Sequence, residues 1–266
     1  MATETTPPLD VALAKLRAAI DESRRLLNSL QVHGEHYLLE FALMSYLRGA
    51  IASAEVVELA TQARHPAGTE PVVRSLFETS VDLLYLLSGP ALDEDAARTL
   101  VADLREWDRK WDLQEKAGTA TVQAVQREAS SDETFTAFAA QLDRVGCDTT
   151  AARRIHAEAK EKGRRWPHWS GKTRSDVLDE LERRGSDVVP MLRAMWAHFS
   201  GEAHPSARWL TLAAAVQQDG TLLVPDTVAS DDAEVIRLAD AAASLLYVTS
   251  RCVAHYYEAT YTSAHA

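Results

Sequence analysis

The side chains best suited to chemistry gather in one stretch, residues 186–206, SDVVPMLRAMWAHFSGEAHPS. It carries Arg193, His198, Ser200 and His204, which we take as the candidate catalytic residues. A histidine can move a proton and an arginine can stabilise charge on a phosphoryl group, so these residues could act on a phosphate. Ser200 and His204 are one helical turn apart and could pair as nucleophile and base. The alternative is that these groups only hold the end of a helix in place.

The Arg-x4-His spacing of Arg193 and His198 resembles the motif of HEPN-type ribonucleases. In that family a helical bundle dimerises, and the arginine and histidine of both copies surround an RNA phosphate. The resemblance therefore implies metal-independent RNA cleavage. On a regular helix a five-residue step turns through about 500°, which leaves the two side chains offset by about 140°. The alternative is an exposed arginine and a histidine packed in the core.

A second polar pair interrupts a largely apolar helix expected over residues 70–90. Arg74 and Glu78 are four residues apart and so share one face of that helix. A buried charge is costly unless it is paired. The two residues are therefore expected either to form an intrahelical salt bridge or to join a polar network with the side chains of residues 186–206.

A basic segment with aromatic residues precedes that stretch. Residues 151–174 carry eight lysines and arginines against two glutamates, in a chain whose net charge is −11. Arg164, Arg165, Trp169 and Lys172 are the candidates for phosphate contact and base stacking. The alternative is a solvated helix face beside a corner filled by tryptophan. The overall acidity argues against a general nucleic-acid coat.

Three short motifs together carry a wider resemblance. They are Arg74, Ser75 and Glu78; Trp169, Ser170, Gly171 and Lys172; and Ser200, His204 and Ser206. Their order and spacing resemble a bacterial all-helical family of uncharacterised function, over roughly residues 35 to 260. The resemblance implies a helical bundle with a shared polar cluster and no established activity. Some such proteins are similar to HEPN or abortive-infection proteins, which implies toxin or phage-defence biology.

The elements that must position these residues are helices. Apolar side chains recur every three or four residues, and glycine and proline are few. The pattern predicts helices over residues 10–30, 34–63, 70–90, 92–116, 119–129, 132–145, 174–184, 186–204 and 231–260. The expected fold is mainly α, a single bundle of about eight or nine helices over residues 9–262, after a disordered tail at 1–8. Asp219 and Gly220 between apolar runs leave open a small β-hairpin near residues 209–225.

The sequence also indicates several absences. It has no His-x3-His, no Glu-x-x-His and no cysteine cluster, so we expect no metal and no cofactor. No apolar run approaches the length of a membrane span, no signal peptide begins the chain, and Cys147 and Cys252 lack metal spacing. We therefore expect a cytoplasmic protein.

Two functions remain open from the sequence. The first is a HEPN-like effector directed at RNA or a nucleotide, a candidate ribonuclease that acts as a homodimer. The second is a non-catalytic helical protein for partner binding or dimerisation, in which an Arg/Glu/Ser/His network serves the structure.

Overall fold

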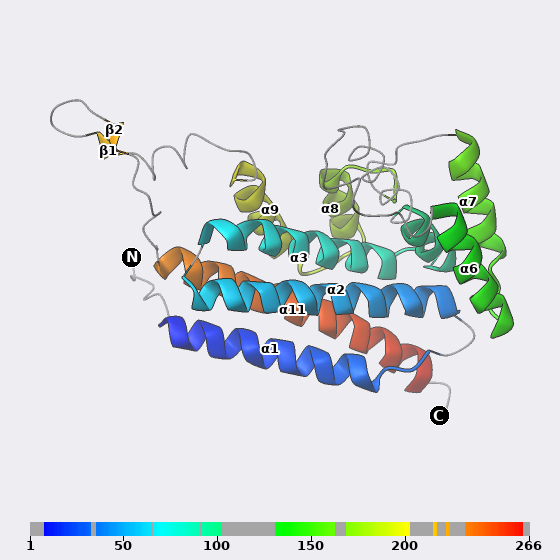
Figure 1. The fold of residues 1–266 in the computed structure, drawn as a ribbon, viewed down its shortest axis with the longest axis horizontal. Coiled ribbons are helices and arrows are strands. Elements are labelled where there is room, and N and C mark those ends of the chain that lie inside the picture. Colours follow the sequence, from blue (N-terminus) through cyan, green and yellow to red (C-terminus); the bar gives the residue numbers. More distant parts are fainter. Residues whose placement is uncertain are drawn as a thin grey trace, which may run out of the picture. The chain divides into compact units, whose positions relative to one another are not determined.

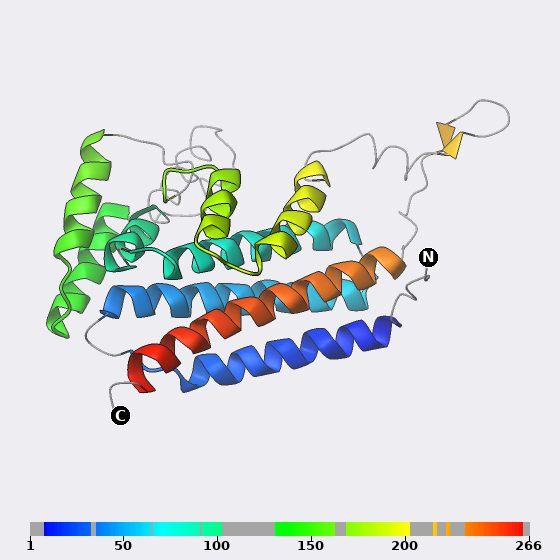
Figure 2. The same ribbon diagram turned by 180° about the vertical axis from the view of Figure 1, so that it is seen from behind.

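The structure is a computed structural model that describes residues 8–32, 36–64, 66–90, 92–102, 131–162, 169–202, 215–216, 222–223 and 232–262. It is mainly α, as the sequence predicted (Figures 1 and 2). Its helices are α1 (Leu9–Ser29), α2 (Tyr37–Gln62), α3 (Pro66–Leu87), α6 (Ser131–Arg144), α7 (Thr150–Lys162), α8 (Arg174–Arg183), α9 (Val189–Glu202) and α11 (Asp232–Tyr257). A π-helical turn, η2 (Glu258–Thr262), follows α11, and residues 92–102 are also helical.

A short antiparallel strand pair lies inside the range expected for a hairpin. β1 (Ala215–Val216) pairs with β2 (Leu222–Leu223), with Ala215 opposite Leu223. Outside the described residues lie positions 1–7 of the tail expected at 1–8 and the helix expected over 119–129.

Local chemistry explains where α8 begins and ends. The Thr173 hydroxyl accepts a hydrogen bond from the Asp176 N–H at 3.2 Å, and the Asp176 carboxylate accepts one from the Thr173 N–H at 3.1 Å. This reciprocal pair satisfies N–H groups that the first helical turn leaves open. At the other end Gly185 adopts φ +82°, and the Ser186 N–H donates to the Leu181 carbonyl at 3.1 Å. A left-handed glycine with this bond closes a helix, as predicted from the sequence.

The start of α3 differs from the expected one. The sequence predicted helices over residues 34–63 and 70–90 with a break between them, whereas α3 begins at Pro66. Proline is favoured at the first helical position, since its fixed φ suits the helix and its missing N–H is not needed there.

The chain forms two compact units. The first comprises Met1–Leu30, Ser45–Tyr85 and Leu178–Ala266, and the second comprises Gln31–Met44 and Leu86–Val177. α2 contributes to both. The expectation of one domain over residues 9–262 stays a prediction.

In the first unit α1, the later part of α2, α3 and α11 run side by side (Figures 1 and 2). The buried side of α11 supplies aliphatic residues to this core, among them Leu238, Ala242, Leu245, Leu246 and Val253. Two hydroxyl pairs join α11 to its neighbours inside the core. Ser250 contacts Ser23 of α1 at 2.7 Å, and Thr249 contacts Ser80 of α3 at 2.8 Å.

Ion pairs on the surface of the first unit fasten α1 to two neighbouring helices. Arg17 pairs with Glu58 at 2.6 Å and Arg24 pairs with Glu55 at 2.7 Å, both on α2. Lys15 pairs with Asp240 of α11 at 2.8 Å. Each such pair is worth at most about 1 kcal/mol, so the apolar core carries most of the stability.

The second unit packs aromatic rings between its helices. Phe41 lies 5.0 Å from Phe138 of α6, measured between ring centroids. Phe135 of α6 stacks on His156 of α7 at 4.1 Å. Asp132, in the first turn of α6, pairs with His156 at 3.2 Å and with Lys160 at 2.6 Å, which ties α6 to α7.

Candidate functional site

Arg193, the first of the candidate catalytic residues, is engaged by two carboxylates. Its Nη2 atom donates to Asp179 at 2.5 Å and to Glu182 at 2.8 Å, both on α8. These bonds raise the pKa of Arg193 above its ordinary value, with Asp179 contributing most. One guanidinium thus contacts two carboxylates, and the net charge of the three groups is −1. The side chain of Arg193 is therefore bound to α8.

His198 lies five residues further along α9 and is half-buried. Its Nε2 atom is enclosed by the protein and inaccessible to solvent. The structure therefore brings Arg193 to α8 and holds one nitrogen of His198 inside the fold. Ser200 lies on α9, but its side chain is outside what the structure describes, as are His204, Arg164 and Arg165 altogether.

Arg74 and Glu78 form the intrahelical pair that the sequence offered as one of two options. The Arg74 Nε atom donates to the Glu78 carboxylate at 3.2 Å, and both side chains are partly exposed. The Arg74 guanidinium also lies 5.7 Å from the centre of the Trp196 ring on α9. Trp196 stacks in turn on Phe77, whose side chain is fully buried, at 5.9 Å. Arg74 thus reaches α9 through a cation–π contact.

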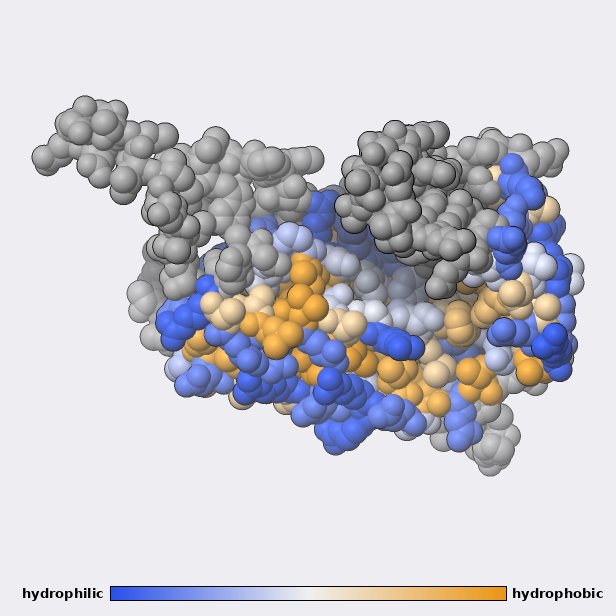
Figure 3. All heavy atoms as spheres, in the orientation of Figure 1, coloured by the Kyte–Doolittle hydropathy of each residue, from blue (hydrophilic) through white to orange (hydrophobic). Residues whose placement is uncertain are grey.

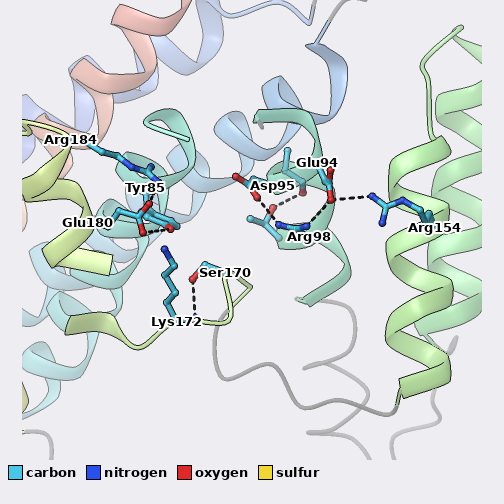
Figure 4. A network of polar contacts seen from close by, with 11 residues as sticks. Tyr85, Glu94, Asp95, Arg98, Arg154, Ser170, Lys172, Glu180 and Arg184 are labelled. Atoms are coloured by element: carbon cyan, nitrogen blue, oxygen red, sulfur yellow. Dashed lines mark hydrogen bonds and ion pairs between the residues drawn. The ribbon is translucent and has the colours of Figure 1, made fainter. Parts of the chain in front are cut away.

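A second cluster joins α3 to α8 near the end of α3. The Tyr85 hydroxyl donates to the Glu180 carboxylate at 3.1 Å, and Arg184 pairs with that same carboxylate (Figure 4). The Arg184 guanidinium lies 4.8 Å from the centre of the Tyr85 ring. A carboxylate, a cation and an aromatic ring therefore satisfy one another in this cluster.

The Trp-Ser-Gly-Lys motif forms a turn in the second unit, just before α8. Trp169 is buried, and Gly171 adopts φ +71°, a left-handed conformation that favours glycine. The Ser170 hydroxyl accepts a hydrogen bond from the Lys172 backbone N–H at 3.3 Å (Figure 4). The described part of the motif is thus an ordered turn, with Lys172 half-buried.

A polar cluster that the sequence did not single out also lies in the second unit. Glu94 accepts from Arg98 at 2.7 Å and from Arg154 of α7 at 3.0 Å (Figure 4). These contacts lower the pKa of Glu94, and the hydrogen bond from Arg154 is the largest cause. Asp95 pairs with the same Arg98 at 3.2 Å. Arg98 lies four residues after Glu94 and three after Asp95, so sequence spacing could have indicated those pairs. Only the contact with Arg154 depends on packing.

The sequence analysis did not single out two glutamates that the structure buries. Glu40 of α2 is 0% exposed and Glu70 of α3 is 8% exposed. Their spacing from buried apolar residues on the same helix could have identified them. Glu40 precedes Leu43 and Leu47 at steps of three and four, and Glu70 stands in the same relation to Val73 and Phe77, so each glutamate lies on a buried stripe.

Over the described ranges, no group of three or more histidine, cysteine or acidic residues could hold a metal ion. None of the described helices is long and apolar enough to cross a membrane. Burial raises the pKa of the Cys252 thiol to about 11, which suppresses its reactive thiolate form.

Comparison with known proteins identifies a family. A family model described as "Family of unknown function (DUF5677)" matches residues 40–220, more than half of the chain. No curated protein and no solved structure matches the chain. The resemblance to a family without an assigned activity is thus confirmed at that level, and the likeness to HEPN proteins stays a prediction. The chain belongs to DUF5677, a family of unknown function.

Proposed function

We propose that this protein is a non-catalytic helical binding protein, whose contacts among α3, α8 and α9 hold a fixed surface for a protein partner. The observation that carries the proposal is the pairing of Arg193 with Asp179 at 2.5 Å and with Glu182 at 2.8 Å. An arginine that serves an RNA phosphate must present its guanidinium to that phosphate. Here the guanidinium already binds two carboxylates of the same chain.

Electrostatics adds to this argument. A phosphate approaching Arg193 meets two carboxylates and one cation, in a chain whose net charge is −11. Nucleic-acid binding relies on cations that are free to replace counterions along the backbone. A residue already neutralised within the protein contributes little to that exchange.

Three polar residues of α3 also have partners within the protein. Arg74 pairs with Glu78 and covers Trp196, and Tyr85 donates to Glu180. Such contacts fix α8 and α9 on α3 and give the unit one shape. A fixed shape lowers the entropy lost on binding, which favours a role in binding a protein partner.

The test is cleavage of labelled total RNA in EDTA by wild type, Arg193→Ala and His198→Ala. Arg183→Ala is the matched control, since Arg183 lies on α8 with a side chain 72% exposed and only a 3.9 Å contact to Glu180. We expect no cleavage by any of the four proteins. We also expect a small drop in melting temperature for Arg193→Ala and none for Arg183→Ala, because only Arg193 joins two helices.

The alternative function is an RNA-directed effector, and one outcome of this test would support it. Metal-independent cleavage by wild type, retained by Arg183→Ala and lost in Arg193→Ala or His198→Ala with circular dichroism unchanged, would overturn the proposal. In that case Arg193 would have to leave Asp179 and Glu182 when RNA binds.

A further inference from the structure

One face of α2 is apolar and open to solvent. Val56 is 47% exposed and Leu59 is 65% exposed, and Ser45, Gly49 and Ala52 are exposed on the same side. Figure 3 shows apolar side chains over α2 between hydrophilic ones. The five positions are separated by four, three, four and three residues. That spacing is the one by which two helices pack along a shared seam.

Gly49 lies on this face in open space, so the described part of its own chain offers no packing reason for a glycine there. A glycine inside a helix is destabilising relative to alanine, so it needs a reason. A Cβ atom added at Gly49 would meet nothing within 4 Å, and the backbone there does not require a positive φ. The described part of the chain therefore does not require a glycine at this position, whereas the close approach of another helix would.

The face is complementary to itself when reversed. Its first half is small (Ser45, Gly49 and Ala52), and its second half is large (Val56 and Leu59). Antiparallel pairing of two copies sets the large half of each against the small half of the other. The small residues allow the two helix backbones to approach closely.

Charges along the seam favour the same arrangement. Arg48 and Glu55 are seven residues apart, two helical turns, so they lie on the same flank of the seam. Arg48 is exposed and forms no ion pair with any side chain that the structure describes. In an antiparallel pair centred near Ala52, Arg48 of each copy lies level with Glu55 of the other. Glu55 already accepts Arg24 of α1 at 2.7 Å, so each copy would bring Arg48 to the other as a second cation on that carboxylate.

We propose that this face of α2 docks a second copy of the chain, with the two α2 helices antiparallel about a two-fold axis near Ala52. The inference rests on the proposed function as a binding protein and names its partner. A two-fold axis uses the same patch on both copies, which is the usual form of a homodimer.

The first experiment measures mass by sedimentation velocity, up to about 100 µM protein so that micromolar association is detected. Wild type should sediment as a dimer, at twice the chain mass of 29.3 kDa. Leu59→Glu and Gly49→Leu should raise the dimer dissociation constant by at least about tenfold. Val11→Glu is the matched control, since Val11 is 54% exposed on α1, outside the seam. Gly49→Ala should raise the melting temperature of the dilute monomer and still weaken the dimer.

A charge exchange tests the geometry without altering the apolar seam. Arg48→Glu should weaken the homodimer by like-charge repulsion. Glu55→Lys should do the same, and it also removes the pair between Glu55 and Arg24 of α1. Mixing the two variants should restore a heterodimer, because each contact then joins opposite charges. Arg251→Glu, an exposed arginine on α11, controls for the change in net charge.

A wild type that stays monomeric would overturn this inference, as would a dimer that withstands both Gly49→Leu and Leu59→Glu. Failure of the mixed variants to associate would overturn the antiparallel register. RNA cleavage in EDTA is measured separately. A monomer without cleavage contradicts only the inference, whereas cleavage contradicts the proposed function whatever the mass.

Discussion

The hydroxyl pair between Ser80 of α3 and Thr249 of α11 predicts a defined energetic coupling in the core of the first unit. Both side chains are 0% exposed, and their oxygens are 2.8 Å apart. Each hydroxyl can also donate to a carbonyl four residues earlier, Leu76 for Ser80 and Leu245 for Thr249, each at 2.9 Å. The Ser80 hydroxyl also lies 3.5 Å from the Leu245 carbonyl. Two protons thus serve four contacts, and removing one hydroxyl leaves the other with a partner.

The perturbation is Thr249→Val, which replaces the hydroxyl by a methyl group of similar size and opens no large cavity. The loss is then one buried hydrogen bond, worth about 0.5–1.5 kcal/mol net. Ser80→Ala should cost a similar amount. Since both remove the same contact, the double variant should cost less than the sum, by about 0.5–1 kcal/mol.

The assay is urea unfolding of the four proteins of this double-mutant cycle, followed by circular dichroism. Thr79→Val is the matched control, because Thr79 is the neighbour of Ser80 and its exposed hydroxyl donates only to the Ser75 carbonyl at 3.0 Å. Its effect should be additive with Thr249→Val. A coupling energy below about 0.3 kcal/mol between Ser80 and Thr249 would refute the reasoning, since independent sites add within that margin.

Three further predictions concern caps, thiols and glycines. Hydrogen bonds from Thr173 hold the pKa of Asp176 below its ordinary 3.8. The ionised Asp176 carboxylate therefore stabilises the folded protein fully above that pH, and this contribution is lost as pH falls through the folded pKa. Asp176→Asn should therefore flatten the fall in melting temperature between about pH 5 and pH 2, and an unchanged acid limb would contradict this cause. Cys252, with its pKa raised to about 11, should react with iodoacetamide far more slowly in the native than in the urea-unfolded chain at about pH 8; mass spectrometry of the labelled peptide checks this, and equal rates would contradict it. Gly185→Ala should destabilise by about 1–2 kcal/mol, because alanine is strained at φ +82°. Gly49 lies in a helix with open space around it, so Gly49→Ala should instead stabilise the monomer by about 1 kcal/mol in urea unfolding. If both substitutions changed the free energy of unfolding in the same direction, this explanation would be wrong.

The helices and many of their ends follow from local sequence. α1 was expected over residues 10–30 and spans Leu9–Ser29, and α11 was expected over 231–260 and spans Asp232–Tyr257. Apolar spacing and the residues that start or stop helices act within a few positions, so the sequence shows them directly. The break before α3 was expected too, although the helix starts at Pro66 rather than at Glu70.

The sequence could name the residues of the candidate site, but it could not show most of their contact partners. The Arg74–Glu78 pair is four residues apart on one helix, and sequence spacing offered it as an option. The partners of Arg193 lie 11 and 14 residues away on another helix, so their contact depends on how α8 packs against α9. The same holds for Trp196, which meets Phe77 and Arg74 across more than a hundred residues of chain.

From the sequence alone it could be predicted that this protein is mainly helical and where several helices begin and end. The sequence also named side chains as candidates for contact with a phosphate, which stays a prediction. These are properties of one segment, set by periodicity and by caps. Only the tertiary structure decided that Arg193 serves two carboxylates, that Glu40 is buried, and that Gly49 and Leu59 share an open face. The reason is that a helix has several faces, and packing against other helices decides which of them is covered, paired or left for a partner.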